Sequence, residues 1–290
     1  VNKYILPEIN KRMGFENIVN ISDESIEYII KSYTLEPGVR KLKELLFDLY
    51  GEINLTLLDA NEKDEVIDLP VTIKIEDLGT KFLKKNHKVK DMKIHKTPMV
   101  GTMNGMWANA LGKGGIIPIE TRFFPASNFL DLKLTGMQGD VMKESMTVAK
   151  TLAWSLTPPE RQKELMKQFE ETKNQGIHIH CPEGAVNKDG PSAGGAITSA
   201  IYSLLNNKPI KNIVSMTGET NLRGRITAIG GLDSKILGSI RAGVKTILYP
   251  VENEDDFKEF MTKYESILDL NEISFHAVDH IDEVLPHIFE

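Results

Sequence analysis

Several features that would assign this chain of 290 residues to a familiar class are scarce or missing in its sequence. Its single cysteine, Cys181, cannot form an internal disulfide, so the disulfide-stabilised secreted proteins are excluded and we expect a reducing compartment. One cysteine also excludes a zinc site built from several cysteines. No segment approaches the roughly 20 consecutive apolar residues of a membrane-spanning helix, and the sequence therefore predicts a soluble protein.

Positive charge is also scarce. The chain has 35 Lys and Arg residues against 41 Asp and Glu residues, a formal net charge of -6, so no overall positive field attracts nucleic acid. Hydrophobic residues make up 41%, ample for a core, and the length predicts two domains. The N-terminal segment 1–8 lacks an initiator Met and resembles neither a signal peptide nor a transit peptide, so we expect the chain to begin inside a longer protein.

Hydrophobic periodicity divides the chain into a helical first part and a mixed second part, separated by the lysine-rich run from Lys81 to Lys96. The predicted domains are residues 1–85 and 97–290, with a linker over 86–96. In the first part we predict a helix capped by Ser22, a helix from Pro37-Gly38 to about Leu58, a solvated loop over 59–65 and a short strand over 71–75.

The second part alternates strands with helices, which indicates an α/β domain. The predicted strands cover 116–119, 130–134, 177–180, 213–216 and 245–250, and the predicted helices cover 139–155, 192–205 and 232–242, followed by a C-terminal strand and helix.

A serine that directly follows a Gly-Pro turn is the first candidate for chemistry. Ser192 comes after Asp189-Gly190-Pro191 and begins a predicted helix of small residues. Backbone N–H groups at a helix start are unpaired and favour negative charge, so they can stabilise an oxyanion beside the hydroxyl. Judged by spacing alone, Ser192 is a simple helix N-cap.

The second candidate is Lys235, which lies among Leu232, Ile236 and Ile240 on a predicted helix. A neutral amine within hydrogen-bond reach of a serine can take its proton. At a pKa of about 10.4, only about one lysine in 2,500 is neutral at pH 7, so Lys235 must be desolvated to act as a base. Taken without Ser192, the residue is a surface lysine whose stem lies along apolar neighbours.

Three sequence blocks containing these candidates resemble the proteolytic domain of the Lon family, the ATP-dependent endopeptidase La. The blocks are Lys188–Gly194, Met216–Glu219 and Ile229–Lys235. In that family the serine of the first block is the nucleophile and the lysine of the third is its partner, which corresponds to Ser192 and Lys235. The resemblance implies an α/β (α+β) Lon-type protease domain preceded by a small, mainly α-helical AAA+ subdomain.

The resemblance also suggests supporting residues. Thr217 is expected to orient the lysine amine, and the residues expected to hold loops or tune charge near the site are Glu120, Asp189, His178 and His180. For each of these five residues, Thr217 included, a structural hydrogen bond is at least as good an explanation as a chemical role. A Ser-His-Asp triad with Ser192 and His180 is an alternative, although Lys235 explains more of the sequence. Gly195 departs from the family pattern, which commonly has a bulkier residue there.

Residues 1–85 are similar to the small helical subdomain that closes the Lon ATPase module, and Tyr33–Arg40 matches its sensor-2 segment, which assigns nucleotide sensing to Arg40. The chain has no Gly-x-x-x-x-Gly-Lys-[Ser/Thr] phosphate loop, so we expect it to bind neither ATP nor a metal by itself. The resemblance implies a longer protein that binds ATP and magnesium.

The resemblance further implies a homohexamer that degrades unfolded, damaged or regulatory proteins in a bacterial cytoplasm or a mitochondrial matrix, with neither a membrane nor nucleic acid as its main partner. Two alternatives stay open. The first is a free-standing, ATP-independent Lon-like peptidase. The second is a non-proteolytic Lon-like module that serves as a ring-forming scaffold, although such modules lack the serine and the lysine found here.

Overall fold

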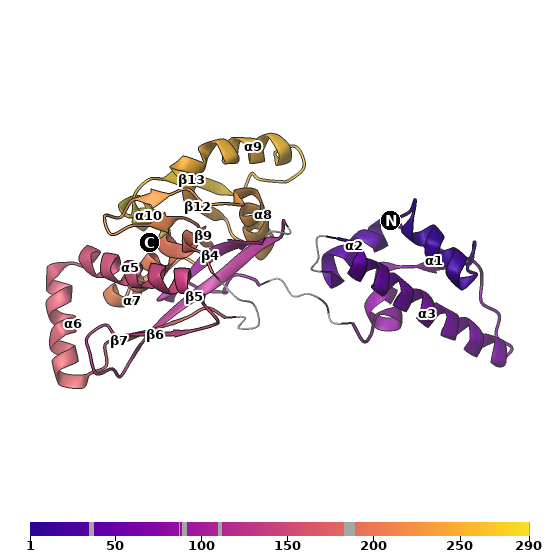
Figure 1. The fold of residues 1–290 in the computed structure, drawn as a ribbon, viewed down its shortest axis with the longest axis horizontal. Helices are drawn as coiled ribbons and strands as arrows, with labels where there is room; N and C mark the ends of the chain where they lie inside the picture. Colours follow the sequence, from indigo (N-terminus) through magenta and orange to yellow (C-terminus); the bar gives the residue numbers. More distant parts are fainter. Residues whose placement is uncertain (35–37, 87, 89–91, 110–111, 183–188, 290) are drawn as a thin grey trace. The chain divides into compact units, whose positions relative to one another are not determined.

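A computed structural model describes residues 1–34, 38–86, 88, 92–109, 112–182 and 189–289. The chain divides into two compact units, Val1–Lys90 and Asp91–Glu290 (Figure 1). No helix in the described ranges is long and apolar enough to cross a membrane. Three predicted features lie wholly or partly outside these ranges: Pro37 with the neighbouring sensor-2 residues, part of the linker, and the residues 183–188 that precede Asp189.

The first unit is mainly helical, as predicted. Its elements are α1 (Ile5–Met13), β1 (Val19–Ile21), α2 (Asp23–Tyr33), α3 (Arg40–Glu62), β2 (Val71–Ile73), α4 (Ile75–Asp77) and a π turn (Leu78–Phe82). Ser22 caps α2, because its side chain accepts a hydrogen bond from the Ser25 N–H at 3.2 Å. The predicted loop over 59–65 is wrong in its first residues, since α3 continues to Glu62 and places Ala60 in the core beside the apolar stripe.

The core of this unit lies between its helices. Strands β1 and β2 are parallel, with Val19 opposite Val71. The largest buried contribution comes from α3, whose inward face carries leucines at helical spacing: Leu42, Leu45, Leu46 and Leu49. Burial of this stripe explains why a sequence with many charges still forms a long helix.

The second unit is built on a mixed seven-stranded sheet in the order β13-β12-β9-β4-β5-β7-β6. These strands are β4 (Thr102–Ala108), β5 (Gly114–Phe124), β6 (Leu132–Thr135), β7 (Gly176–His180), β9 (Val214–Met216), β12 (Thr246–Pro250) and β13 (Ser274–Val278). Two short antiparallel pairs flank it: β3 (Met99–Val100) with β8 (Pro209–Ile210), and β10 (Glu219–Thr220) with β11 (Ile226–Thr227).

Helices cover both faces of this sheet (Figure 1). They are α5 (Asp140–Leu156), α6 (Pro159–Thr172), α7 (Gly194–Asn206), α8 (Leu232–Ala242), α9 (Glu254–Tyr264) and α10 (Ile281–Ile288). Alternate residues of β5 separate the two cores, since Ile117 packs with α5 and α7 whereas Ile116 packs with α8 and α9. This layering confirms the predicted α/β class.

Two helices differ from what the sequence predicts. The helix predicted over 192–205 begins at Gly194, after a 3-10 turn over Pro191–Ala193. The sequence does not predict α6, because a Pro158-Pro159 pair usually ends a helix. Pro159 instead occupies the first turn of α6, where its missing N–H is not needed. Residues near the end of the predicted linker pack on the second unit, with the Ile94 N–H bonded to the Ala242 carbonyl at 3.2 Å.

Helix α8 lies directly against β5, because glycines remove the side chains between them. A Cβ placed on Gly114 would lie 2.0 Å from the Ser234 carbonyl oxygen, and one placed on Gly238 would lie 2.3 Å from the Gly114 carbonyl carbon. This close approach fixes the height of α8 above the sheet, and α8 carries Lys235.

Candidate active site

Ser192 lies in the 3-10 turn over Pro191–Ala193 that leads into α7, and it is partly exposed. The structure does not use it as an N-cap of that helix. The residue at the N-cap position of α7 is Ala193, and no side chain caps the helix there. The simple N-cap interpretation is therefore wrong, and the Ser192 hydroxyl is left without a capping role.

Lys235 lies in the first turns of α8 and is buried, with only 4% of its surface exposed. Its Nζ donates to the Thr217 Oγ1 at 3.2 Å. Burial lowers the pKa of Lys235 from 10.5 to about 8, because the protonated amine loses its hydration. A cation near a helix N-terminus is also disfavoured by the helix dipole. The setting therefore favours the neutral amine that a base requires.

The segment after β9 joins the two candidates. Thr217, fully buried, donates through its Oγ1 to the Ser192 carbonyl oxygen at 3.2 Å, and the Gly218 N–H donates to the same oxygen at 2.8 Å. The Gly195 N–H in turn donates to the Gly218 carbonyl at 3.0 Å. Thr217 thus contacts the Lys235 amine through its hydroxyl on one side and the Ser192 backbone on the other.

The Met216 side chain fills the space next to Gly195, where a side chain on residue 195 would otherwise lie. A Cβ placed on Gly195 would lie 2.1 Å from the Met216 Cε, so the methionine side chain occupies the position where the family commonly has a bulkier residue on the helix.

Asp189 ties two segments together next to Ser192. Its Oδ1 accepts from the Met142 N–H and from the Gly190 N–H, each at 3.1 Å. The first bond satisfies a free N–H in the first turn of α5. Gly139 makes room for the carboxylate, since a Cβ there would lie 2.3 Å from the Asp189 Cγ. In the structure Asp189 holds a loop.

The two histidines contact a different residue from the one that the triad alternative requires. His178 Nε2 and His180 Nδ1 both hydrogen-bond the Thr135 Oγ1, at 2.9 Å and 2.8 Å. Burial, followed by the nearby Lys133 and His180, lowers the pKa of His178. Their hydrogen bonds within the described residues therefore do not build a Ser-His pair.

Glu120 lies on β5, in register with His180 and Thr135 across the neighbouring strands β7 and β6. It lies opposite His180 on β7 and opposite Thr102 on β4, and its carboxylate is 4.0 Å from the His95 Nε2. Sequence reasoning gave no signal for Thr135, because its meeting with the two histidines depends on the pairing of β6 with β7.

Arg40 is the first residue of α3 in the first unit, and its side chain is 90% exposed. It forms a 3.5 Å ion pair with Glu44 one turn further on. Among the described residues the structure shows no ion pair of Arg40 other than this one, and its nucleotide-sensing role stays a prediction.

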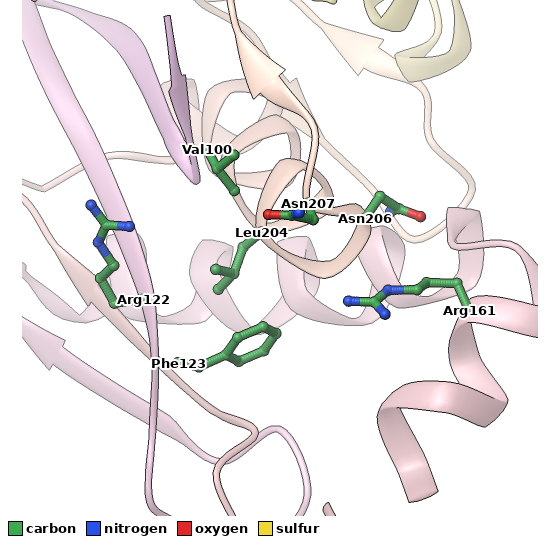
Figure 2. A pocket seen from close by; sticks show the side chains of 7 residues that line it. All are labelled: Val100, Arg122, Phe123, Arg161, Leu204, Asn206 and Asn207. Carbon is green, nitrogen blue, oxygen red and sulfur yellow. The ribbon is translucent and has the colours of Figure 1, made fainter. Parts of the chain in front are cut away.

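A surface pocket of about 540 Å³ lies elsewhere on the second unit (Figure 2). Its lining residues are Val100, Arg122, Phe123, Arg161, Leu204, Asn206 and Asn207. Asn206 and Asn207 are at the C-terminal end of α7, whereas Ser192 precedes the N-terminal end. The length of α7, about 20 Å, separates this pocket from Ser192, so the pocket is distinct from the candidate site.

An α/β domain in which one threonine contacts both a serine turn and a buried lysine indicates a serine peptidase as the class of protein to compare. Residues 72–290 match the family model of the Lon protease (S16) C-terminal proteolytic domain, and residues 11–65 match that of the Lon protease AAA+ ATPase lid domain. The chain therefore belongs to the Lon protease family.

Curated relatives agree with this assignment. The chain is 38% identical to a Lon protease of Metamycoplasma arthritidis over 95% of its own length and 31% of the relative's. It is 36% identical to a Lon protease of Halothermothrix orenii, covering 98% of this chain and 34% of the relative, and 31% identical to a Lon protease homolog of Acanthamoeba polyphaga mimivirus, covering 97% and 32%. The chain thus spans about a third of the length of these relatives.

Proposed function

We propose that this chain is the proteolytic portion of an ATP-dependent serine endopeptidase and that Ser192 and Lys235 form its catalytic dyad. The observation that carries the proposal is the burial of Lys235, whose amine bonds the same threonine that bonds the Ser192 backbone. Burial of a lysine is costly, and an amine of lowered pKa near a presented serine is the arrangement that a general base needs.

The proposed reaction is acyl transfer. The neutral Lys235 amine takes the proton of the Ser192 hydroxyl as the oxygen attacks the carbonyl carbon of the scissile peptide bond. Lys235 then gives that proton to the leaving amine, so the C–N bond breaks and an ester forms on Ser192. A water molecule, deprotonated by Lys235, hydrolyses the ester and frees the serine. Backbone N–H groups around the serine turn are the candidate donors to the oxyanion.

The activity of the whole protein is a further part of this proposal. We expect a nucleotide-driven motor outside this chain that binds ATP and magnesium, with Arg40 facing the nucleotide, and assembly into a homohexamer. Unfolded, damaged or regulatory proteins are the proposed substrates, in a reducing intracellular compartment. Since no phosphate loop occurs in the 290 residues, no step of the peptide cleavage proposed here involves ATP.

Substitution of each dyad residue tests the proposal on a short fluorogenic peptide. Ser192→Ala and Lys235→Ala should each abolish cleavage, and the double variant should be no worse, because the two residues act as a unit. Lys235→Arg should also be inactive, since a guanidinium keeps its proton at any usable pH. Ser155→Ala and Lys258→Ala are the matched controls. Cleavage by Lys235→Ala at the rate of the unchanged protein would contradict the dyad.

The pH profile separates the dyad from the histidine alternative. Peptide cleavage should rise with pH through a midpoint near the lowered pKa of Lys235, about 8, because only the deprotonated amine is a base. A profile with a midpoint typical of histidine, together with loss of activity in His180→Ala, would favour the triad instead.

A further inference from the structure

The short segment that leads into α8 is held from the side by one buried asparagine. Asn253 is 3% exposed and lies in a 3-10 turn over Val251–Asn253, directly after β12. Its Oδ1 accepts from the Ile229 N–H at 2.9 Å, and its Nδ2 donates to the Ile229 carbonyl at 2.9 Å. One side-chain amide thus pairs with both backbone groups of a single residue, as a neighbouring strand would. We call the two hydrogen bonds between the Asn253 side chain and the Ile229 backbone the clamp.

Neighbouring side chains add further hydrogen bonds beside the clamp. The Asp256 carboxylate accepts a second hydrogen bond from the Asn253 Nδ2 at 2.6 Å, which fixes the direction of the amide. Glu252 accepts from the Ala228 N–H at 2.9 Å and from the Arg225 guanidinium at 3.1 Å. Two consecutive residues of the turn therefore hold two consecutive residues of the segment before α8.

The two residues between the clamp and α8 do not by themselves fix the direction of the helix. It consists of Gly230 and Gly231, and Gly231 is in the left-handed region with φ +69°. Glycine allows many backbone conformations, so the direction of α8 must be set by contacts outside the glycine pair. Lys235 follows within one turn, and its N–H bonds the Gly231 carbonyl at 3.1 Å.

Strand β12 also holds Thr217, the residue that the Lys235 amine contacts. The Thr217 N–H donates to the Leu248 carbonyl at 3.1 Å, and Leu248 is five residues before Asn253 on the same continuous segment. The segment from Leu248 to Asn253 therefore holds Thr217 at one end and, at the other, Ile229, which precedes α8 and Lys235. The distance from the lysine amine to the threonine hydroxyl depends on both attachments.

We propose that Asn253 is a positioning residue of the active site, which holds Ile229 so that α8 presents the Lys235 amine to Thr217 and, through it, to the Ser192 turn. The proposal rests on the proposed function of Lys235 as the base. Asn253 touches neither the serine nor the lysine and acts only through the backbone that enters α8. The close contact of α8 with β5 fixes the height of the helix, and the clamp fixes where its first turn begins.

The test combines peptide kinetics with a direct titration of the lysine. In Asn253→Ala, kcat should fall by about tenfold or more with KM changed less than about twofold, since a misplaced base affects the chemical step. In protein labelled with 13C at the lysine ε-carbon, the Lys235 signal, identified by its loss in Lys235→Met, should titrate near 8 in the unchanged protein and at a higher pH in Asn253→Ala. The higher midpoint is expected because the loosened helix lets water reach the amine.

Asn206→Ala is the matched control, because its Nδ2 also donates to a backbone carbonyl, that of Tyr202 at 2.9 Å, at the far end of α7 from Ser192. Asp256→Ala, which keeps the bonds to Ile229, should lie between Asn253→Ala and the unchanged protein. An Asn253→Ala variant with an unchanged Lys235 midpoint and unchanged kcat would overturn the proposal, even if its melting temperature fell. A Lys235 midpoint near 10.5 in the unchanged protein would instead contradict the proposed function.

Discussion

Replacing Lys235 with methionine should make the second unit more stable at neutral pH while it removes activity. Burial lowers the pKa of Lys235 from 10.5 to about 8, so the folded chain binds this proton more weakly than the unfolded chain does. Between pH 8 and 10.5 the unfolded chain keeps a proton that the folded chain has released, and the free energy of unfolding therefore rises with pH across this window. Well below pH 8 both states bind the proton, and Lys235 then makes its full unfavourable contribution to the free energy of unfolding.

The magnitude follows from the same change in pKa. At about 1.4 kcal/mol for each pH unit, the contribution at pH 7 is about 3 kcal/mol. Because Lys235 is only 4% exposed, solvent screening reduces it little. Methionine has a similar length and no charge, so it fills the space left by the lysine, while the Thr217 Oγ1 keeps its bond to the Ser192 carbonyl. We expect a gain of about 2 to 3 kcal/mol at pH 7 that falls below about 1 kcal/mol at pH 10.

Urea unfolding followed by tryptophan fluorescence measures this effect in the correct unit, since Trp107 and Trp154 both lie within Asp91–Glu290. Lys258→Met is the control: that lysine is 66% exposed on α9 and pairs with Asp255, so its loss should change the free energy of unfolding by less than about 0.5 kcal/mol at either pH. If Lys235→Met and the unchanged protein have equal free energies of unfolding at both pH values, Lys235 is not desolvated and the reasoning fails.

Substitutions at three further positions test other contacts of the site. Thr217→Val should lower kcat on a short peptide by about tenfold or more because it removes the hydroxyl that receives the Lys235 amine, whereas Thr217→Ser should keep most of the activity. Gly114→Ala should lower the free energy of unfolding by several kcal/mol, about 3 or more by urea titration, since a Cβ there would lie 2.0 Å from an α8 carbonyl oxygen. Asp189→Ala should lower it by about 1 kcal/mol in the same assay through loss of the bond to the first turn of α5.

The sequence was sufficient to predict the elements that repeat an apolar pattern. Ser22 and the isoleucines behind it define α2, and Leu232 and Ile236 define α8 with its predicted bounds. The apolar neighbours of Lys235 did not select it by themselves, and its assignment depended on the resemblance of three sequence blocks to the Lon family. The helix α6 could not be predicted in this way, because it is polar on most of its surface and buries only Leu165 within its span.

Contacts between distant segments explain what sequence reasoning missed at the site. The pairing of β6 with β7 brings Thr135 to His178 and His180, and no local pattern indicates that register. The contact of Asn253 with Ile229 could not be predicted either, since the two residues are 24 positions apart and the hydrogen bonds run from a side chain to a backbone. Side-chain clamps of this kind follow from tertiary structure, whereas helical periodicity is a property of neighbouring residues.

The burial of Lys235 needs an explanation of its own, because a buried amine gains hydration free energy whenever its helix shifts toward solvent. The glycines at Gly114 and Gly238 let the α8 backbone rest on β5, so the helix has no side chain to slide over and a shift would open a void between the two backbones. The close packing of α8 on β5 therefore keeps the Lys235 amine away from water. Burial of the Lys235 amine lowers the stability of the fold, and the packing of α8 on the sheet offsets this loss. The lowered pKa that the proposed base requires therefore depends on glycines that take no part in the proposed chemistry.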